Sequence, residues 1–280
     1  MTRPIISLDH VHYSYPESPD TAILRDISFT IEAGQWVSII GANGSGKSTL
    51  VKLFNGLLSA CEGQIRIGDT LLSPDTLYDI RRQIGFVFQN PENQFVGTTV
   101  LEDMAFGLEN LALDRHVMQE RVRHYAEKLN ITPFLARHPS ELSGGQKQRA
   151  AIAAILAMEP GIVIFDEATS MLDEQARREI LAIMEQMRRS GDYTIVSITH
   201  DADEIEASDR VIALSEGHVI ADGTPLSLME RADIMEPCHL IPSFYLRLAR
   251  QLQHQYRLPV HLHPDERGIV EELCQLYSAK

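Results

Sequence analysis

The sequence predicts an α/β fold, in which helices alternate with the buried strands of a parallel sheet. Two observations lead to this prediction. Short apolar runs typical of buried strands recur at residues 36–40, 84–88, 162–165 and 193–199. The first run ends in a glycine-rich turn, and residues 49–54 then open a helix.

Composition narrows the classes of function. The net charge is −14, which argues against a partner that is a nucleic acid and against adsorption to anionic lipid. The longest apolar run, residues 150–158, is far shorter than the roughly 20 residues of a membrane-spanning helix. The N-terminus shows no apolar leader, so we expect no signal peptide. Cys61, Cys238 and Cys274 are odd in number and far apart, which suits a reducing cytosol.

The N-terminal segment is expected to form strands. Residues 5–11 alternate apolar and polar side chains, and residues 22–31 indicate one or two further strands. Tyr13 and Tyr15 are expected to follow the first strand. An aromatic ring here offers a π-face on which adenine can stack. The alternative is a surface aromatic that only anchors the loop.

The strongest motif is Gly-Ala-Asn-Gly-Ser-Gly-Lys-Ser, which matches the phosphate-binding pattern G-x-x-x-x-G-K-[ST] between a strand and a helix. Its glycines let successive N–H groups point at phosphate oxygens, and the helix N-terminus adds partial positive charge. Lys47 is placed to reach the β- and γ-phosphates, and the Ser48 hydroxyl to ligate Mg²⁺. A turn that binds nothing is disfavoured because the whole motif is present in the right context. The predicted ATP-binding residues of this loop are Gly41, Ala42, Asn43, Gly44, Ser45, Gly46, Lys47, Ser48 and Thr49.

The next segment leads to a polar loop. Residues 63–67 predict a strand, residues 77–82 a short helix and residues 84–88 a buried strand. Gln89 begins a loop rich in amides at the carboxyl end of that strand, where ligands bind in α/β sheets. Its side chain can ligate Mg²⁺ or hold a water; the alternative is a solvated loop whose amides cap its own backbone.

A helical insertion follows, because residues 100–111, 114–129 and 144–158 all predict helices. The third helix opens with the sequence Leu142, Ser143, Gly144, Gly145 and Gln146. Ser143 and Gln146 fit a capping box, which alone would explain the helix start. Each glycine costs about 1 kcal/mol relative to alanine, so the pair also indicates close approach of another group, such as a phosphate.

Two carboxylates and a histidine follow later strands of the predicted sheet. Asp166 is expected to hold Mg²⁺, directly or through water. Glu167, expected on the opposite side of the pleat, is the candidate to polarise the water that attacks the γ-phosphate. Alone, two acids indicate a solvated turn, but the phosphate loop favours catalysis. His200 follows residues 193–199 at the same edge, where its imidazole can donate to a γ-phosphate oxygen; the alternative is polar surface.

The C-terminal part changes character. Residues 210–216 and 218–222 predict a closing hairpin, and residues 225–232 a short helix. Residues 243–254 and 266–278 predict amphipathic helices. His261 and His263 lie between them, but no carboxylate or cysteine stands at ligand spacing. A tail for helix packing or dimerisation is therefore favoured over a metal site.

Over about residues 5–225 the chain resembles the nucleotide-binding subunits of ATP-binding cassette (ABC) transporters. The resemblance is carried by the Walker A loop, the Gln89 loop, the signature at residues 142–146, Walker B at Asp166 and Glu167, the loop ending at Asp173 and the switch histidine His200. It implies ATP and Mg²⁺ as cofactors, with Ser48, Gln89 and Asp166 at the metal. It implies that Glu167, His200 and Gln89 act in catalysis, and that Tyr15 rather than Tyr13 stacks on adenine.

The resemblance also implies an architecture. An ABC-type P-loop NTPase has a RecA-like core with an antiparallel β subdomain, here expected at residues 1–98 and 160–225, and a helical signature subdomain at residues 99–159. Residues 226–280 would form a C-terminal helical extension that serves dimerisation. Two cassettes are expected to close head to tail, so that residues 143–146 of one clamp ATP on the phosphate loop of the other.

A narrower similarity is to the ATPases of energy-coupling factor (ECF) transporters, most like the first paralogue, which are related to cobalt-importer ATPases. It is carried by residues 89–100 and 105–110 and by the tail after Gly223. It implies an ATPase that drives uptake of a vitamin or other micronutrient. The implied partners are a second ATPase, paralogous or identical, a membrane T component and a substrate-binding S component. The chain would lie on the cytoplasmic face of the cell membrane as a peripheral protein.

The sequence leaves three alternative functions. An ATPase of a cobalt- or nickel-type importer is the nearest alternative. A soluble cassette of translation or DNA repair is disfavoured, because the chain has a single cassette, a short insertion and an acidic balance. A nucleotide-sensing scaffold is disfavoured by the presence of both Glu167 and His200.

Overall fold

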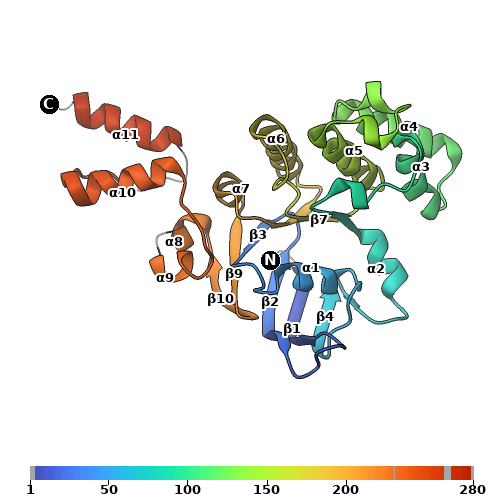
Figure 1. The fold of residues 1–280 in the computed structure, drawn as a ribbon, viewed down its shortest axis with the longest axis horizontal. Coiled ribbons are helices and arrows are strands. Elements are labelled where there is room, and N and C mark those ends of the chain that lie inside the picture. Colours follow the sequence, from blue (N-terminus) through green and yellow to red (C-terminus); the bar gives the residue numbers. More distant parts are fainter. Residues whose placement is uncertain (1–3, 230, 262–265, 279–280) are drawn as a thin grey trace.

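The computed structural model describes residues 4–229, 231–261 and 266–278, and it contains two β-sheets flanked by helices (Figure 1). The smaller sheet has four strands in the order β2-β1-β4-β5, and the larger has six in the order β10-β9-β3-β8-β7-β6. The mixed α/β class predicted from the sequence is confirmed.

The smaller sheet is antiparallel. Its strands are β1 (Pro4–Ser14), β2 (Ala22–Glu32), β4 (Glu62–Ile67) and β5 (Thr70–Leu71). Strand β1 runs further than expected and includes Tyr13, whose side chain is only 4% exposed. Strand β2 is continuous, which decides between the one or two strands expected there.

The larger sheet has five parallel strands and one antiparallel edge strand, β10, which the predicted hairpin joins to β9. Every residue of β3, β6, β7 and β8 is buried, as their unbroken apolar runs predict for a sheet covered on both faces. The strands are β3 (Trp36–Ile40), β6 (Ile84–Val87), β7 (Ile162–Asp166), β8 (Thr194–Ile198), β9 (Arg210–Ser215) and β10 (His218–Gly223).

The helices follow the predicted order with two differences. The prediction of a single helix over residues 225–232 is wrong, because the structure has two short helices, α8 and α9, in this region. Helix α7 was not predicted; it starts after Asp201, whose carboxylate accepts the Glu204 N–H. The helices are α1 (Lys47–Phe54), α2 (Leu77–Gln83), α3 (Val100–Asn110), α4 (Arg115–Lys128), α5 (Gly144–Ala157), α6 (Glu174–Ser190), α7 (Ala202–Ala207), α8 (Pro225–Met229), α9 (Ala232–Met235), α10 (Phe244–Tyr256) and α11 (Glu266–Ser278).

Two large hydrophobic cores cover most of the two faces of the larger sheet, and a smaller cluster covers β9 and β10 beneath α7 to α9. One lies between this sheet, helix α1 and the smaller sheet, and it includes Ile39, Leu53 and Phe54. The other lies between the sheet and helices α3 to α6, and it includes Trp36 and Phe165. Strand alternation explains the division, since neighbouring residues of a strand face opposite cores.

The C-terminal helices form a separate projection at the opposite end of the molecule from α3 to α5 (Figure 1). Helices α10 and α11 pack together around Ala249, Val260 and Ile269. Large apolar side chains remain exposed here, including Phe244 at 71% and Tyr277 at 85%. None of the helices in the described ranges has the length and apolar character needed to cross a bilayer.

The first core gives a matched pair of leucines. Replacing the fully buried Leu53 with alanine is expected to lower the free energy of unfolding by about 2–5 kcal/mol, because it leaves a cavity. The same change at Leu57, which is 50% exposed, is expected to cost less than about 1 kcal/mol. Urea unfolding of both variants measures the difference. Similar losses would contradict this placement of the core.

Candidate functional site

Strand register brings three loops to one edge of the larger sheet. Ile198 of β8 pairs with Ile39 of β3 on one side and with Asp166 of β7 on the other. The strands are parallel, so the segments that follow them emerge together. These segments carry Gly41, Glu167 and His200, as the sequence predicted.

The loop between β3 and α1 depends on glycine. Gly41, Gly44 and Gly46 have φ of 152°, 81° and 103°, in the region that side chains disfavour. A Cβ on Gly41 would lie 2.2 Å from the Leu214 carbonyl oxygen, and one on Gly46 would lie 2.7 Å from a methyl carbon of Leu24. The turn therefore fits against β9 and β2 only without side chains at Gly41 and Gly46.

Lys47 is the first residue of α1, and its side chain is only 5% exposed. Its ammonium donates to the carbonyl oxygens of Gly41 at 2.6 Å and Ala42 at 3.1 Å. Burial lowers the pKa of Lys47, and the charges of Glu167 and Asp166 oppose that shift. The buried Ser45 hydroxyl finds no hydrogen-bond partner among the described residues. A cationic loop with an unpaired donor fits a phosphate group.

Ser48 and Asp166 provide two oxygen ligands of a candidate magnesium site. The Ser48 hydroxyl donates to the Asp166 carboxylate at 2.9 Å, which joins α1 to the end of β7. Burial raises the pKa of Asp166, and the Ser48 hydrogen bond opposes that shift. Hydroxyl and carboxylate oxygens suit Mg²⁺. The described residues contain no group of three His, Cys, Asp or Glu that could hold a metal by themselves, so phosphate oxygens would complete this coordination.

Glu167 adopts a left-handed conformation, with φ of 50°, directly after β7 ends. Its N–H donates to the Ile198 carbonyl at 3.0 Å. The expectation that Asp166 and Glu167 lie on opposite sides of a pleat is therefore wrong, because the backbone is no longer extended at Glu167. The turn lets Glu167 line the same cleft as Ser48.

Gln89 and His200 both lie against the Glu167 carboxylate. The Gln89 amide nitrogen donates to one oxygen at 3.0 Å and to the Ser170 hydroxyl at 3.3 Å. His200 Nε2 lies 3.8 Å from the other oxygen. Burial lowers the pKa of His200, the Lys47 charge lowers it further, and Glu167 opposes both. A neutral imidazole at neutral pH is therefore expected beside this carboxylate.

Tyr15 lies at the rim of the phosphate loop. Its hydroxyl is 3.0 Å from the Thr49 hydroxyl, and its ring is 37% exposed, whereas Tyr13 is buried beneath it in an edge-to-face contact. Of the two tyrosines, Tyr15 is the one whose ring is accessible to a base. A cleft of about 330 Å³ is lined by Tyr15, Ile23, Asn43, Gly44, Gly46, Lys47, Ser48, Thr49 and Glu167.

The signature segment lies elsewhere, since none of residues 142–146 lines this cleft. Both halves of the predicted capping box are present at Ser143 and Gln146. A Cβ on Gly145 would lie 2.6 Å from the Ala176 Cβ, so the packing of α5 on α6 already requires this glycine. Gly144 has no such contact, because its nearest neighbour would be Leu172 at 3.8 Å. Internal packing therefore explains Gly145, and the prediction of an outside group is needed only for Gly144.

Asp173 caps helix α6, and its carboxylate accepts the Ala176 N–H at 2.8 Å. It thus ends the loop that begins at Glu167. Sequence reasoning missed Thr169, Thr199 and Glu204, which lie behind this loop. The spacing of Asp201 and Glu204, typical of a helix start, was the available signal.

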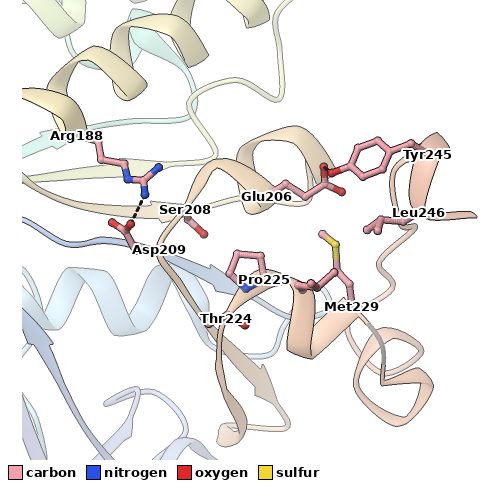
Figure 2. Close-up of a pocket in the computed structure, with 10 residues that line it drawn as sticks. Arg188, Glu206, Ser208, Asp209, Thr224, Pro225, Met229, Tyr245 and Leu246 are labelled. Atoms are coloured by element: carbon pink, nitrogen blue, oxygen red, sulfur yellow. Dashed lines mark hydrogen bonds and ion pairs between the residues drawn. The ribbon is translucent and has the colours of Figure 1, made fainter. Parts of the chain in front are cut away.

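A larger cavity of about 460 Å³ lies away from this edge, between α7, α8 and α10, and none of the predicted site residues lines it (Figure 2). Its wall includes Glu206, to which the Tyr245 hydroxyl donates, and the ion pair of Arg188 with Asp209.

His261 pairs with Glu272 at 2.6 Å, and His263 lies outside the described residues.

Comparison with known proteins gives consistent matches. The sequence profile of the family described as ABC transporter matches residues 24–170. The energy-coupling factor transporter ATP-binding protein EcfA1 of Lactiplantibacillus plantarum is 44% identical over 282 aligned residues, covering 100% of each chain. The structure of cbiO1 from Clostridium perfringens, described as part of the ABC transporter complex cbiONQ, has a TM-score of 0.77 at 30% identity over 91% of this chain and 100% of that one. A dimeric post-hydrolysis state of the ATP-binding cassette MJ0796, bound to ADP and Pi, has a TM-score of 0.70 at 30% identity over 79% of this chain and 98% of that one.

The two glycines of the signature give a stability test. Gly145→Ala is expected to lower the melting temperature, because α6 must move away from the new methyl group. Gly144→Ala is expected to leave it unchanged or raise it slightly, because the position is open and alanine favours helix. Thermal unfolding followed by circular dichroism compares them. The reverse order would show that α5 and α6 pack differently.

Proposed function

We infer the function from one premise: the chain belongs to the ABC transporter family, among its energy-coupling factor transporter ATP-binding proteins. It is an ATPase subunit that binds ATP and Mg²⁺. The predicted family, fold class, enzyme class and cofactors are thereby confirmed. The roles of individual residues, the partners and the location remain proposals.

The observation that carries the proposed mechanism is the contact of Glu167 with Gln89 and His200 beside the phosphate loop. We assign ATP to the cleft between Tyr15 and this loop, with the adenine ring on Tyr15. Lys47 turns its ammonium to the β- and γ-phosphates, and the loop N–H groups donate to the phosphate oxygens. Ser48, Asp166 and the Gln89 carbonyl would hold Mg²⁺, which when bound neutralises phosphate charge.

Glu167 then acts as general base toward the attacking water. Its carboxylate already accepts a hydrogen bond from Gln89, which fixes its orientation. His200 donates a hydrogen bond to the γ-phosphate and stays within reach of Glu167. Positioning and charge neutralisation supply most of the acceleration, as in other phosphoryl transfers.

The site is complete only with a second copy of this architecture. Residues 142–146 do not line the cleft in their own chain, and Gly144 is open to solvent without an internal packing reason. We assign Leu142 and the following four residues, with their helix N-terminus, to ATP held by the partner. Asp173, at the end of the loop that starts with Glu167, would lie at the same interface between the two copies.

The second ATPase is proposed to be a paralogue or an identical copy, and both sit beneath a membrane T component and a substrate-binding S component. The description of cbiO1 as part of a transporter complex supports this assembly. We place the chain on the cytoplasmic face of the membrane as a peripheral protein. ATP hydrolysis would drive uptake of a vitamin or another micronutrient, and a cobalt- or nickel-type importer is the alternative.

We propose that residues 1–225 form the ATPase domain, with residues 99–159 as its helical subdomain, and that residues 226–280 serve dimerisation. The exposed Phe244 and Tyr277 on the C-terminal helices support an interface there.

The base is tested by Glu167→Gln. This variant is expected to bind ATP and to accumulate as closed dimers, while turnover falls by about 10²-fold or more, because an amide cannot take the proton. Phosphate release and size-exclusion chromatography with ATP measure both effects. Unchanged turnover would mean that another residue is the base.

The partners are tested by purification from solubilised membranes. A tagged full-length chain is expected to bring down a second cassette ATPase and at least one integral membrane protein, identified by mass spectrometry. ATP-dependent uptake by the reconstituted complex would then identify the transported solute. Recovery of the chain only as a soluble monomer would contradict the assembly.

A further inference from the structure

We propose that Glu204 is a positioning residue for ATP hydrolysis. Through one buried carboxylate oxygen it holds the segment that follows the base Glu167 against the segment that carries His200. This inference rests on the proposed function of that site, and it assigns a role to a residue outside the sequence motifs.

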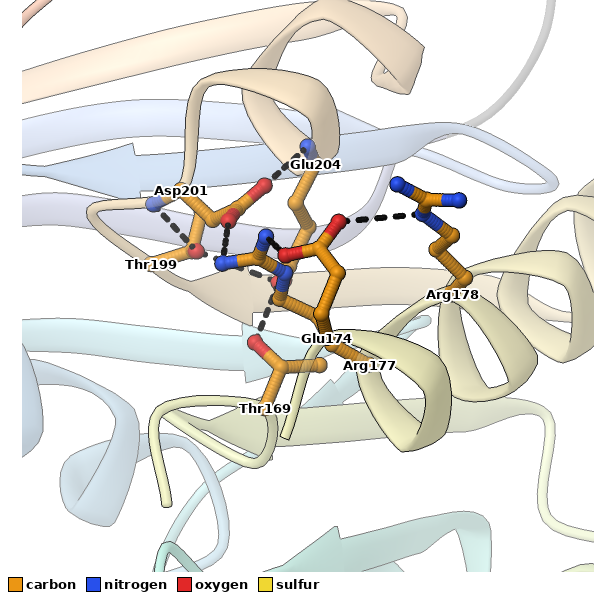
Figure 3. Close-up of polar contacts among 7 residues, drawn as sticks. All are labelled: Thr169, Glu174, Arg177, Arg178, Thr199, Asp201 and Glu204. Atoms are coloured by element: carbon orange, nitrogen blue, oxygen red, sulfur yellow. Dashed lines mark hydrogen bonds and ion pairs between the residues drawn. The ribbon is translucent and has the colours of Figure 1, made fainter. Parts of the chain in front are cut away.

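Two threonines share that oxygen (Figure 3). The Thr169 hydroxyl donates to Glu204 Oε2 at 3.0 Å, and the Thr199 hydroxyl donates to the same atom at 3.1 Å. Thr169 lies two residues after Glu167, and Thr199 immediately precedes His200. All three side chains are at most 5% exposed. One atom on α7 therefore joins the two loops that meet at the γ-phosphate.

Thr199 is fixed by a further contact. The Thr199 hydroxyl also accepts the Asp201 N–H at 3.0 Å, so it bridges Glu204 and the start of α7. The Asp201 carboxylate in turn accepts the Glu204 N–H at 3.1 Å. These bonds hold α7 directly behind His200. A displacement of Glu204 would move the histidine backbone with it.

An outer contact joins the same two segments near the surface. Arg177, in the first turn of α6, pairs with Asp201 at 2.9 Å and also with Glu174 (Figure 3). Solvent screens this partly exposed ion pair. The inner link through Glu204 is buried, so its hydrogen bonds are screened less than the outer ion pair. Of these two side-chain links, the inner one should therefore do more to fix how the two loops lie once they leave the paired strands.

Apolar packing alone gives no reason for a carboxylate here. Burial raises the pKa of Glu204 to about 7, against the opposing effect of the hydroxyls of Thr169, Thr199 and Ser197. An apolar residue at this position would avoid the unfavourable desolvation of an acid. What an apolar side chain cannot do is accept two hydrogen bonds from different loops at once. That capacity is the specific property the proposal assigns to Glu204.

The functional consequence is geometric. The side chains of Glu167 and His200 approach to 3.8 Å, and their segments are those that Glu204 joins. A shift of about 1 Å in a catalytic group can reduce turnover by about a hundredfold. Loss of the link should therefore lower kcat. It should leave the KM for ATP almost unchanged, because the phosphate loop and Tyr15 do not depend on it.

The test uses the full chain in the complex in which it is purified. Thr169→Val and Thr199→Val each remove one donor to Glu204 and keep the shape, and the double variant removes both. Thr199→Val also removes the acceptor of the Asp201 N–H, so Thr169→Val is the cleaner of the two variants. The matched control is Thr194→Val, at the other end of β8, where a buried threonine accepts the Gly34 N–H at 3.0 Å far from Glu204. Glu204→Gln keeps an acceptor oxygen, and Glu204→Ala removes it. ATP turnover, KM for ATP and melting temperature are measured for each.

We expect each single variant at Thr169 or Thr199 to lower kcat by about tenfold with KM within about twofold of the parent. The double variant should be no more than about twofold worse than either single one, since losing one donor already breaks the link. Thr194→Val should lose comparable thermal stability with kcat unchanged. Glu204→Gln should recover most of the activity that Glu204→Ala loses.

Two results would overturn the proposal. One is kcat values for Thr169→Val and Thr199→Val equal to that of Thr194→Val. The other is a Glu204→Gln variant as impaired as Glu204→Ala. If Glu167→Gln abolishes turnover while the threonine variants remain fully active, only this inference fails. If Glu167→Gln is itself active, the assignment of the site fails.

Discussion

The parallel pairing of β3, β8 and β7 is the constraint on which the site depends. Ile198 pairs with both Ile39 and Asp166, so the three strands end at one level. The contact of Ser48 with Asp166 requires that alignment, and the contact of Gln89 with Glu167 also requires the pairing of β6 with β7. A slip of one residue in either pairing would move a loop by about 3.3 Å, more than these hydrogen bonds tolerate. The buried apolar strands thus set the chemistry as well as the stability.

Much of the fold was predictable, because its signals are local. The unbroken apolar runs at β3, β7 and β8 indicated buried parallel strands, and the phosphate-loop pattern located the turn into α1. The start of helix α5 at Ser143 and the hairpin at Glu216 could also be predicted from short patterns. The brief helix α7 was missed because six residues show too little periodicity. The break between α8 and α9 was missed for the same reason.

The site was predictable as a set of residues but not as a geometry. Residue type and order identified Lys47, Glu167 and His200. Nothing local indicated that Glu167 leaves the strand in a left-handed turn, or that Gly145 is required by Ala176 on another helix. Both facts depend on contacts between segments distant in the chain. Glu204 illustrates the same limit, since its two partners come from loops 35 and 5 residues away.

The hydrogen bonds of Lys47 have a consequence for the catalytic cycle. Its ammonium is already paired with two carbonyl oxygens of its own loop, so in the proposed ATP complex a phosphate would replace existing acceptors. Such an exchange yields less net free energy than a new pair would, because the old contacts must first break. The nucleotide would then be bound less tightly, and the product of hydrolysis would dissociate faster. Moderate affinity for nucleotide is an advantage for an ATPase that must release its product after every turnover.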